Sequence, residues 1–176
     1  MFIPGFLLSI VTFPGVIVHE FAHQLFCRLY KVPVFQVVYF RVGNPAGYVI
    51  HEKPSNKWQA VMISIGPFFV NTIIGALIAL PAALPVFVYH NANPFHYLLI
   101  YLGVSIAMHA FPSTGDANSI VSTLREPDTK LYIRIIGYPL VGLIYIGSLG
   151  SMFWLDLIYG VGVAVGLPKL FISLAS

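Results

Sequence analysis

Long apolar segments with few charges are the feature that most restricts how this chain can fold. They cover residues 3–29, 58–80, 94–111, 131–149 and 153–174. A helix needs about 20 apolar residues to cross a bilayer, so each segment has the length of a crossing. Hydrophobic residues make up 58% of the chain and charged residues 9%, far from the averages of soluble domains. We therefore predict a single all-α polytopic membrane bundle over residues 1–176, with about five transmembrane helices.

The first apolar segment contains the sequence His19-Glu20-Phe21-Ala22-His23, an HExxH motif. On a helix, residues four apart lie on the same face, so both imidazoles can reach one metal ion. Histidines at this spacing typically bind zinc, and the glutamate beside them acts on a zinc-bound water. Ionisable side chains inside a membrane-length apolar segment are costly and usually functional. The motif predicts a hydrolytic site with one zinc ion per chain, His19 and His23 as ligands and Glu20 as the catalytic residue.

Residues 32–57 differ in character from the apolar segments around them. Residues 34–42 are rich in β-branched and aromatic side chains, residues 43–47 have the composition of a turn, and residues 48–51 are again strand-like. This pattern predicts a small β-hairpin after the first helix. An open sheet edge cannot face lipid, so the hairpin should lie at the membrane interface or line a cavity beside the metal. A re-entrant loop or a plain connector is the alternative.

A zinc hydrolase needs a third protein ligand, and the chain has only six acidic residues. Glu126 and Asp128 lie beside basic residues in a polar connector, which favours solvated surface charge, and Glu52 precedes a lysine in the same way. Asp156 is expected on the opposite side of the membrane. Asp116 follows the third apolar segment at the depth that the histidines require. Asp116 is therefore the predicted third ligand, and the alternative is that it only caps the helix that follows.

Lys and Arg residues predict the orientation in the membrane. Seven of them lie between the first two apolar segments or in the stretch that follows the third and reaches the start of the fourth: Lys31, Arg41, Lys53, Lys57, Arg125, Lys130 and Arg134. The turn between the second and third segments has none. Short cytoplasmic loops are enriched in Lys and Arg. We therefore expect a multi-pass protein of the cell membrane whose amino terminus is outside and whose site opens toward the cytoplasm.

Two further motifs follow the HExxH motif along the chain. One is Gly66-Pro67 with Asn71, and the other is His109-Ala-Phe-Pro112-Ser-Thr-Gly-Asp116. Together the three motifs resemble the site-2 protease family of intramembrane zinc metalloproteases, over about residues 19–116. The resemblance implies zinc bound by the two histidines and Asp116. It also implies that the substrate is a transmembrane helix, which is cut within or near the bilayer.

The chain departs from the usual pattern of that family in several places. His109 stands where Asn is usual, and Ala117 stands where Gly is usual. The spacing from Pro112 to Asp116 is one residue short, and Asn71 is one residue further from Gly66 than in the common form. We also expect no transmembrane segment before the HExxH helix. The chain is therefore expected to be a reduced core with a divergent Asn-x-x-Pro…Asp element.

Other residues are candidates for contact with the substrate. Asn71 and His109 are polar groups in apolar helices, and either one is predicted to donate a hydrogen bond to the developing oxyanion. Hydrogen bonds between helices are the alternative for both. A protease also holds its substrate extended, and the hairpin edge at Gln36, Val38 and Phe40 is the predicted place where the substrate adds a strand.

These inferences lead to one predicted function and two alternatives. The prediction is a zinc-dependent intramembrane endopeptidase that hydrolyses transmembrane substrate segments near the cytoplasmic side. Its catalytic core is expected at about 3–126, followed by carboxyl-terminal spans at 131–174. The expected partners are a transmembrane protein or peptide substrate and the lipid bilayer, and no nucleic-acid patch is present. The alternatives are an inactive metal- or partner-binding protein of the same fold and a small transporter with an intramembrane polar pathway.

Overall fold

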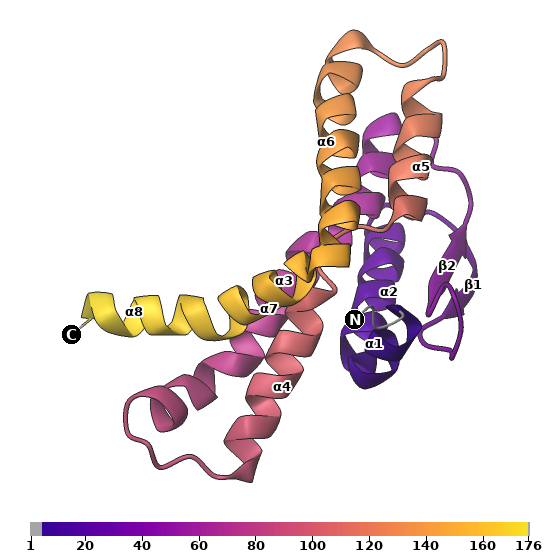
Figure 1. Ribbon diagram of the computed structural model, residues 1–176. Helices are drawn as coiled ribbons and strands as arrows, with labels where there is room; N and C mark the ends of the chain where they lie inside the picture. Colours follow the sequence, from indigo (N-terminus) through magenta and orange to yellow (C-terminus); the bar gives the residue numbers. More distant parts are fainter. Residues whose placement is uncertain (1–4, 176) are drawn as a thin grey trace.

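The structure of this protein, a computed structural model, describes residues 5–175 and is mostly helical (Figure 1). The elements in chain order are α1 (Gly5–Val11), α2 (Phe13–Leu29), β1 (Val34–Val38), β2 (Tyr48–His51), α3 (Lys57–Phe87), α4 (Pro94–Met108), α5 (Thr114–Leu124), α6 (Leu131–Gly150), α7 (Leu155–Val161) and α8 (Leu167–Ala175). A 3-10 turn at Ser151–Phe153 follows α6, and a π-helical stretch at Gly162–Gly166 joins α7 to α8.

Three helical stretches of the described chain are long and apolar enough to cross a membrane: Lys57–Phe87, Leu131–Phe153 and Leu155–Leu174. They correspond to the second, fourth and fifth predicted crossings. Shorter helices occupy the first and third predicted crossings, so a total of five transmembrane helices stays a prediction. The mostly helical fold, with one small hairpin after the first helices, agrees with the expected architecture.

The predicted first crossing is divided into α1 and α2, which Thr12 separates, and its residues 3 and 4 lie outside the described part of the chain. α2 lies against α4 at Gly15, where an added Cβ would come within 2.0 Å of the Ser105 carbonyl oxygen. Only glycine allows the two backbones to approach this closely. The Gly15 N–H donates to Ser105 Oγ at 3.2 Å, and that hydroxyl donates to the Thr12 carbonyl at 3.1 Å. The start of the HExxH helix is therefore held on α4.

The predicted β-hairpin is present beside α2 (Figure 1). β1 and β2 pair in antiparallel fashion, with Val38 opposite Tyr48. β1 ends at Val38, earlier than the predicted strand, because the chain turns into a closed loop beyond it. The main-chain N–H of Arg41 donates to the Ala46 carbonyl at 2.7 Å, and its Nε–H donates to the Pro45 carbonyl at 2.9 Å. These bonds fold the loop back toward α2.

α3 is longer than the predicted second crossing. The sequence indicated a turn from Pro81 onward, and this was wrong, because the helix continues through Pro81 and Pro85 to Phe87. Proline removes a backbone donor, but packing against neighbouring helices makes this tolerable in apolar helices. α3 has such packing on α4, where a Cβ added to Gly103 would lie 2.7 Å from Ala79 Cβ. Tertiary contacts thus override the local preference for a helix end.

α5 and α6 lie side by side with the first part of α3 (Figure 1). They enclose an apolar core made of Val61, Ala117, Ile120, Leu124, Ile133, Val141 and Ile144. The chain bends sharply between α6 and α7 at Trp154, whose φ is 65°. The end of α6 lies near Phe111, since a Cβ added to Gly147 would be 3.5 Å from that ring. The bend therefore places the start of α7 close to the connector between α4 and α5.

Candidate metal centre

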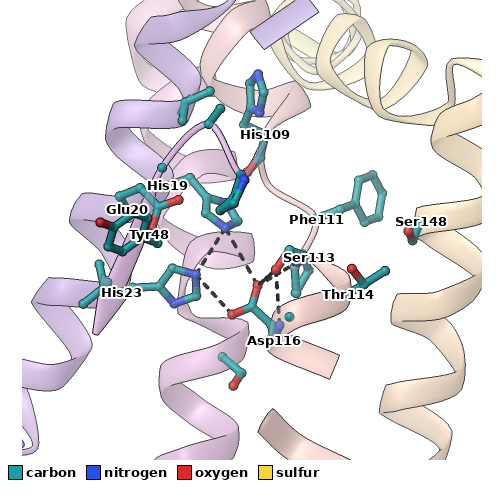
Figure 2. Close-up of a pocket in the computed structure, with 18 of the residues that line it drawn as sticks. His19, Glu20, His23, Tyr48, His109, Phe111, Ser113, Thr114, Asp116 and Ser148 are labelled. Atoms are coloured by element: carbon teal, nitrogen blue, oxygen red, sulfur yellow. Dashed lines mark hydrogen bonds and ion pairs between the residues drawn. The ribbon is translucent and has the colours of Figure 1, made fainter. Parts of the chain in front are cut away.

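His19 and His23 of α2 and Asp116 of α5 turn toward one point (Figure 2). The two Nε2 atoms are 3.2 Å apart, and His23 Nε2 is 3.3 Å from Asp116 Oδ1. His19 Nε2 is 4.0 Å from Asp116 Oδ2. A tetrahedral zinc ion with bonds of about 2.0–2.1 Å separates its ligand atoms by about 3.3 Å. The three predicted ligands are therefore spaced to bind one ion.

Main-chain carbonyls orient both imidazoles. His19 Nδ1 lies 2.7 Å from the His109 carbonyl oxygen, and His23 Nδ1 lies 3.0 Å from the Ile63 carbonyl oxygen. A carbonyl only accepts hydrogen bonds, so in each neutral imidazole Nδ1 carries the proton and Nε2 presents a lone pair. Two lone pairs and a carboxylate then face one another with no donor among them. A cation resolves this repulsion, and it is the observation that makes the donor set fit a metal.

Asp116 is held by the start of the helix that carries it. Its Oδ2 accepts hydrogen bonds from the Ser113 N–H and the Ser113 hydroxyl, each at 2.7 Å, and its own N–H donates to Ser113 Oγ at 3.2 Å. This is a capping box with Ser113 at the N-cap and Asp116 at the N3 position. Oδ1 stays directed at His23. Asp116 thus takes part in capping α5 and also faces the histidines.

Glu20 lies beside the ligands on α2 and is 7% exposed. Gly47, in the turn of the hairpin, covers it: a Cβ added to Gly47 would lie 2.6 Å from Glu20 Cγ and 2.9 Å from Glu20 Oε1. The hairpin therefore forms a wall of the site through its backbone. Turn composition alone marked Gly47 in the sequence, and nothing there connected it to Glu20.

Replacing Gly47 with alanine is expected to displace the Glu20 side chain while leaving the histidines in place. Misplacing a catalytic group by about 1 Å costs on the order of 10²-fold in rate. We expect peptide cleavage to fall by about this factor and the zinc content to stay unchanged. Gly43→Ala is the matched control in the same loop, because a Cβ there meets only Arg41 Nε at 3.9 Å. Equal activity of the two variants would show that Gly47 does not position Glu20.

A cavity of about 720 Å³ opens from His19, His23 and Asp116. Besides the residues of α2, it is lined by residues 44–49 of the hairpin and by residues 111–116, which cover the end of the α4–α5 connector and the start of α5. Ser148, Ser151 and Asp156, from the region of the α6–α7 bend, also line it, as do residues of α1, α3 and α4. The cavity thus joins the metal centre to three segments that are far apart in the sequence.

Both predicted oxyanion donors form hydrogen bonds at the start of the HExxH helix. His109 contacts Thr12, directly before α2, and Asn71 contacts Gly15 within it. His109 lines the cavity, and its Nε2 lies 2.7 Å from Thr12 Oγ1, which donates its single proton to the Leu8 carbonyl. Nε2 is therefore the donor to Thr12. Asn71 is fully buried, and its Nδ2 lies 3.0–3.3 Å from the carbonyls of Gly15, Ile106 and His109.

These contacts are the hydrogen bonds between helices that the sequence left as the alternative. Asn71 connects α3 to α2 and to the end of α4, where the His109 carbonyl orients His19. Direct contact of Asn71 or His109 with an oxyanion stays a prediction. The use of the His109 main chain, in place of its ring, was not visible in the sequence.

The strand that the sequence predicted to bind the substrate does not line the cavity. Gln36 and Val38 belong to β1, whereas Phe40 lies beyond its end and its ring packs 5.8 Å from that of Phe13. None of the three residues lines the cavity, but Tyr48 and Val49 of β2 do. β2 is therefore the strand that lies nearer to the metal centre.

Three of the acids that the sequence set aside lie outside the cavity. Lys57 donates to Glu126, which lowers the pKa of that carboxyl, and Lys53 lies 2.9 Å from the same carboxylate. Lys57 is also 3.3 Å from Asp128. Glu52 does not line the cavity. These contacts agree with the expectation that all three acids are ordinary surface charges.

The position of Asp156 in the structure differs from the one expected from the sequence. We expected it on the opposite side of the membrane from the histidines, because each apolar segment was counted as a full crossing. In the structure it lines the same cavity as the three predicted metal ligands. The cause is the position of the end of α6, whose Gly147 lies against Phe111 next to the α4–α5 connector.

A family model described as "Putative zincin peptidase" (DUF3267) matches residues 12–131. This segment includes both histidines, Glu20, the hairpin and Asp116. No curated protein and no solved structure matches the chain.

Proposed function

The chain belongs to the DUF3267 family, and we propose that it is a zinc-dependent endopeptidase that cleaves transmembrane segments. One observation carries the proposal. His19, His23 and Asp116 present three acceptor atoms at the spacing of zinc ligands, and Glu20 stands beside them in the same cavity. In zinc hydrolases, three protein ligands leave one position open for water and substrate.

His19, His23 and Asp116 would hold a zinc ion, which would supply polarisation of the scissile carbonyl and a lowered pKa of the attacking water. The residues of the chain orient the ligands and transfer the proton. The carbonyls of His109 and Ile63 accept hydrogen bonds from the two Nδ1 atoms and so turn each Nε2 toward the site. Glu20 accepts a proton from the attacking water and returns it to the leaving amine nitrogen as the peptide C–N bond breaks. Gly47 limits the space that the Glu20 side chain can occupy.

The proposed substrate is a transmembrane helix that reaches the site from the bilayer. Large apolar side chains on the three long helices are exposed, among them Leu77, Ile135, Leu143, Ile146 and Ile158, which suits contact with lipid tails. Lys and Arg are concentrated in the connectors on either side of α3 and α4, which supports a site that opens toward the cytoplasm.

An extended substrate needs main-chain partners, and we propose the free edge of the hairpin for this role. β1 and β2 form a two-stranded sheet, so each has an edge without a strand partner in the described residues. β2 supports the role best because Tyr48 and Val49 line the cavity. The edge at Gln36, Val38 and Phe40 is the alternative that the sequence favoured.

Proline substitutions along β2 test this edge. Proline at each position from Tyr48 to His51 removes one N–H, and every second N–H of the strand points away from β1. We expect those outward positions to lose cleavage while zinc content and hydrogen exchange of the hairpin stay close to wild type. The same substitutions at Gln36 and Val38 are the control. If only the substitutions in β1 abolish cleavage, the substrate pairs with the edge of β1, as the sequence predicted.

The function itself is tested with purified protein in detergent or in vesicles. A panel of single-span peptides should be cleaved by the wild type, with activity lost on chelation and restored by zinc. His23→Ala should neither bind zinc nor cleave. Stoichiometric zinc without cleavage of any peptide would favour the inactive binding protein. Ion or solute flux that needs no zinc would favour the transporter.

A further inference from the structure

The cavity of the metal centre carries a third carboxylate that the proposed mechanism does not use. Asp156 is the second residue of α7 and lines the cavity together with Ser148 and Ser151. Its Oδ1 accepts a hydrogen bond from the Leu157 N–H at 2.9 Å. Within the described residues it forms no ion pair. Asp156 is therefore a carboxylate that faces the cavity without a cation of its own.

The charges that line the cavity are unbalanced. The lining includes Glu20, Asp116 and Asp156, and it includes no Lys or Arg. A divalent ion at the metal centre offsets two of these three negative charges, so one remains. The metal ligands and Glu20 share one end of the site, whereas Asp156 comes from the α6–α7 bend. The remaining negative charge therefore favours a cationic group from outside the chain.

Packing fixes Asp156 relative to the metal centre. α7 lies on α4 at Gly160, where an added Cβ would be 2.8 Å from the Val104 carbonyl oxygen. The Tyr159 hydroxyl is hydrogen-bonded to Thr72 Oγ1 of α3 at 2.7 Å, and its ring centroid is 4.9 Å from that of Phe111. Phe111 lies in the connector that leads to α5, the helix that carries Asp116. A carboxylate held rigidly in a reaction cavity can discriminate between substrates by the charge of a side chain.

We propose that Asp156 selects a lysine or arginine side chain of the substrate near the scissile bond. This inference rests on the proposed peptidase function and adds a preference to it. The plain alternative is that Asp156 only stabilises the first turn of α7, where a negative charge is favourable. That role affects folding stability and has no effect on the choice of substrate.

The test uses one single-span peptide that the wild type cleaves. Each position on both sides of the cleaved bond is replaced in turn by lysine, by the uncharged norleucine or by glutamate, and kcat/KM is measured for every peptide. At one position we expect the lysine peptide to exceed the norleucine peptide by at least about tenfold. In Asp156→Asn this ratio should fall to about one, and in Asp156→Lys the glutamate peptide should be preferred.

Controls separate this inference from folding and from the function itself. Asp128→Asn removes an acid outside the cavity and should leave the lysine-to-norleucine ratio as in the wild type. Zinc content shows whether each variant is folded. If Asp156→Lys does not fold, the result with Asp156→Asn alone decides the test. If the wild type cleaves without a preference for basic residues, or if the preference survives in Asp156→Asn, Asp156 does not select the substrate. The proposed peptidase function is unaffected by either result. No zinc-dependent cleavage by the wild type overturns both.

Discussion

Replacing Asp116 with alanine is expected to remove zinc from the protein. The variant leaves two imidazoles as the only protein ligands and withdraws the negative charge that faces them at 3.3 Å. Residues that only orient zinc ligands contribute roughly 10–100-fold to affinity, so loss of a ligand should exceed that range. Zinc per chain, measured by metal analysis after dialysis, should fall as far as in His19→Ala.

Graded and matched variants sharpen this result. Ser113→Ala keeps the carboxylate of Asp116 but removes the hydroxyl that holds its Oδ2, so zinc affinity should weaken by about tenfold. Asp128→Ala and Glu52→Ala remove acids that do not line the cavity and should retain zinc. Full zinc occupancy in Asp116→Ala would show that this residue only caps α5.

The second large effect concerns Glu20. Glu20→Gln keeps the size of the side chain, which matters because Gly47 lies against its Cγ. We expect zinc content to be unchanged and kcat to fall by about 10²–10⁴-fold, the usual contribution of general acid–base catalysis. The measurement is cleavage of one peptide under single-turnover conditions, so that product release does not mask the chemical step.

Glu20→Asp completes the comparison. It keeps the charge but shortens the side chain by one methylene, so the carboxylate is withdrawn from the attacking water and intermediate activity is expected. If Glu20→Gln cleaves as fast as the wild type, Glu20 is not the proton acceptor and another group of the cavity takes that role. Loss of zinc in Glu20→Gln would instead make Glu20 part of the metal centre.

Local patterns in the sequence predicted much of the fold and of the metal centre. Hydrophobic composition located the apolar helices, and β-branched and turn residues located the hairpin. The four-residue spacing of His19 and His23 placed both on one face of α2. The scarcity of acids made the search for the third ligand short, and the structure brings Asp116 to the two histidines. The helices and the hairpin could be predicted because each depends on residues close in the chain, and elimination was enough to select the acid that the structure places beside the histidines.

Tertiary contacts overruled the sequence in two places. Pro81 indicated the end of a helix, but packing of α3 on α4 carries the helix to Phe87. Asp156 was assigned to the far side of the membrane, but the bend at Trp154 and the contact of α6 with Phe111 bring it into the cavity. Both errors arose because the length of an apolar segment does not reveal where its ends lie relative to other helices.

By itself, the sequence determined which side chains we propose for the chemistry: two histidines, a glutamate and an aspartate. Only the tertiary structure decided what holds them, namely the carbonyls of His109 and Ile63, the close approach of Gly47 and the neighbourhood of Asp156. The physical reason is that orientation here depends largely on main-chain atoms. Every residue has a carbonyl, so no residue type marks the one that accepts a hydrogen bond from a ligand. That choice is made when segments distant in the chain pack together.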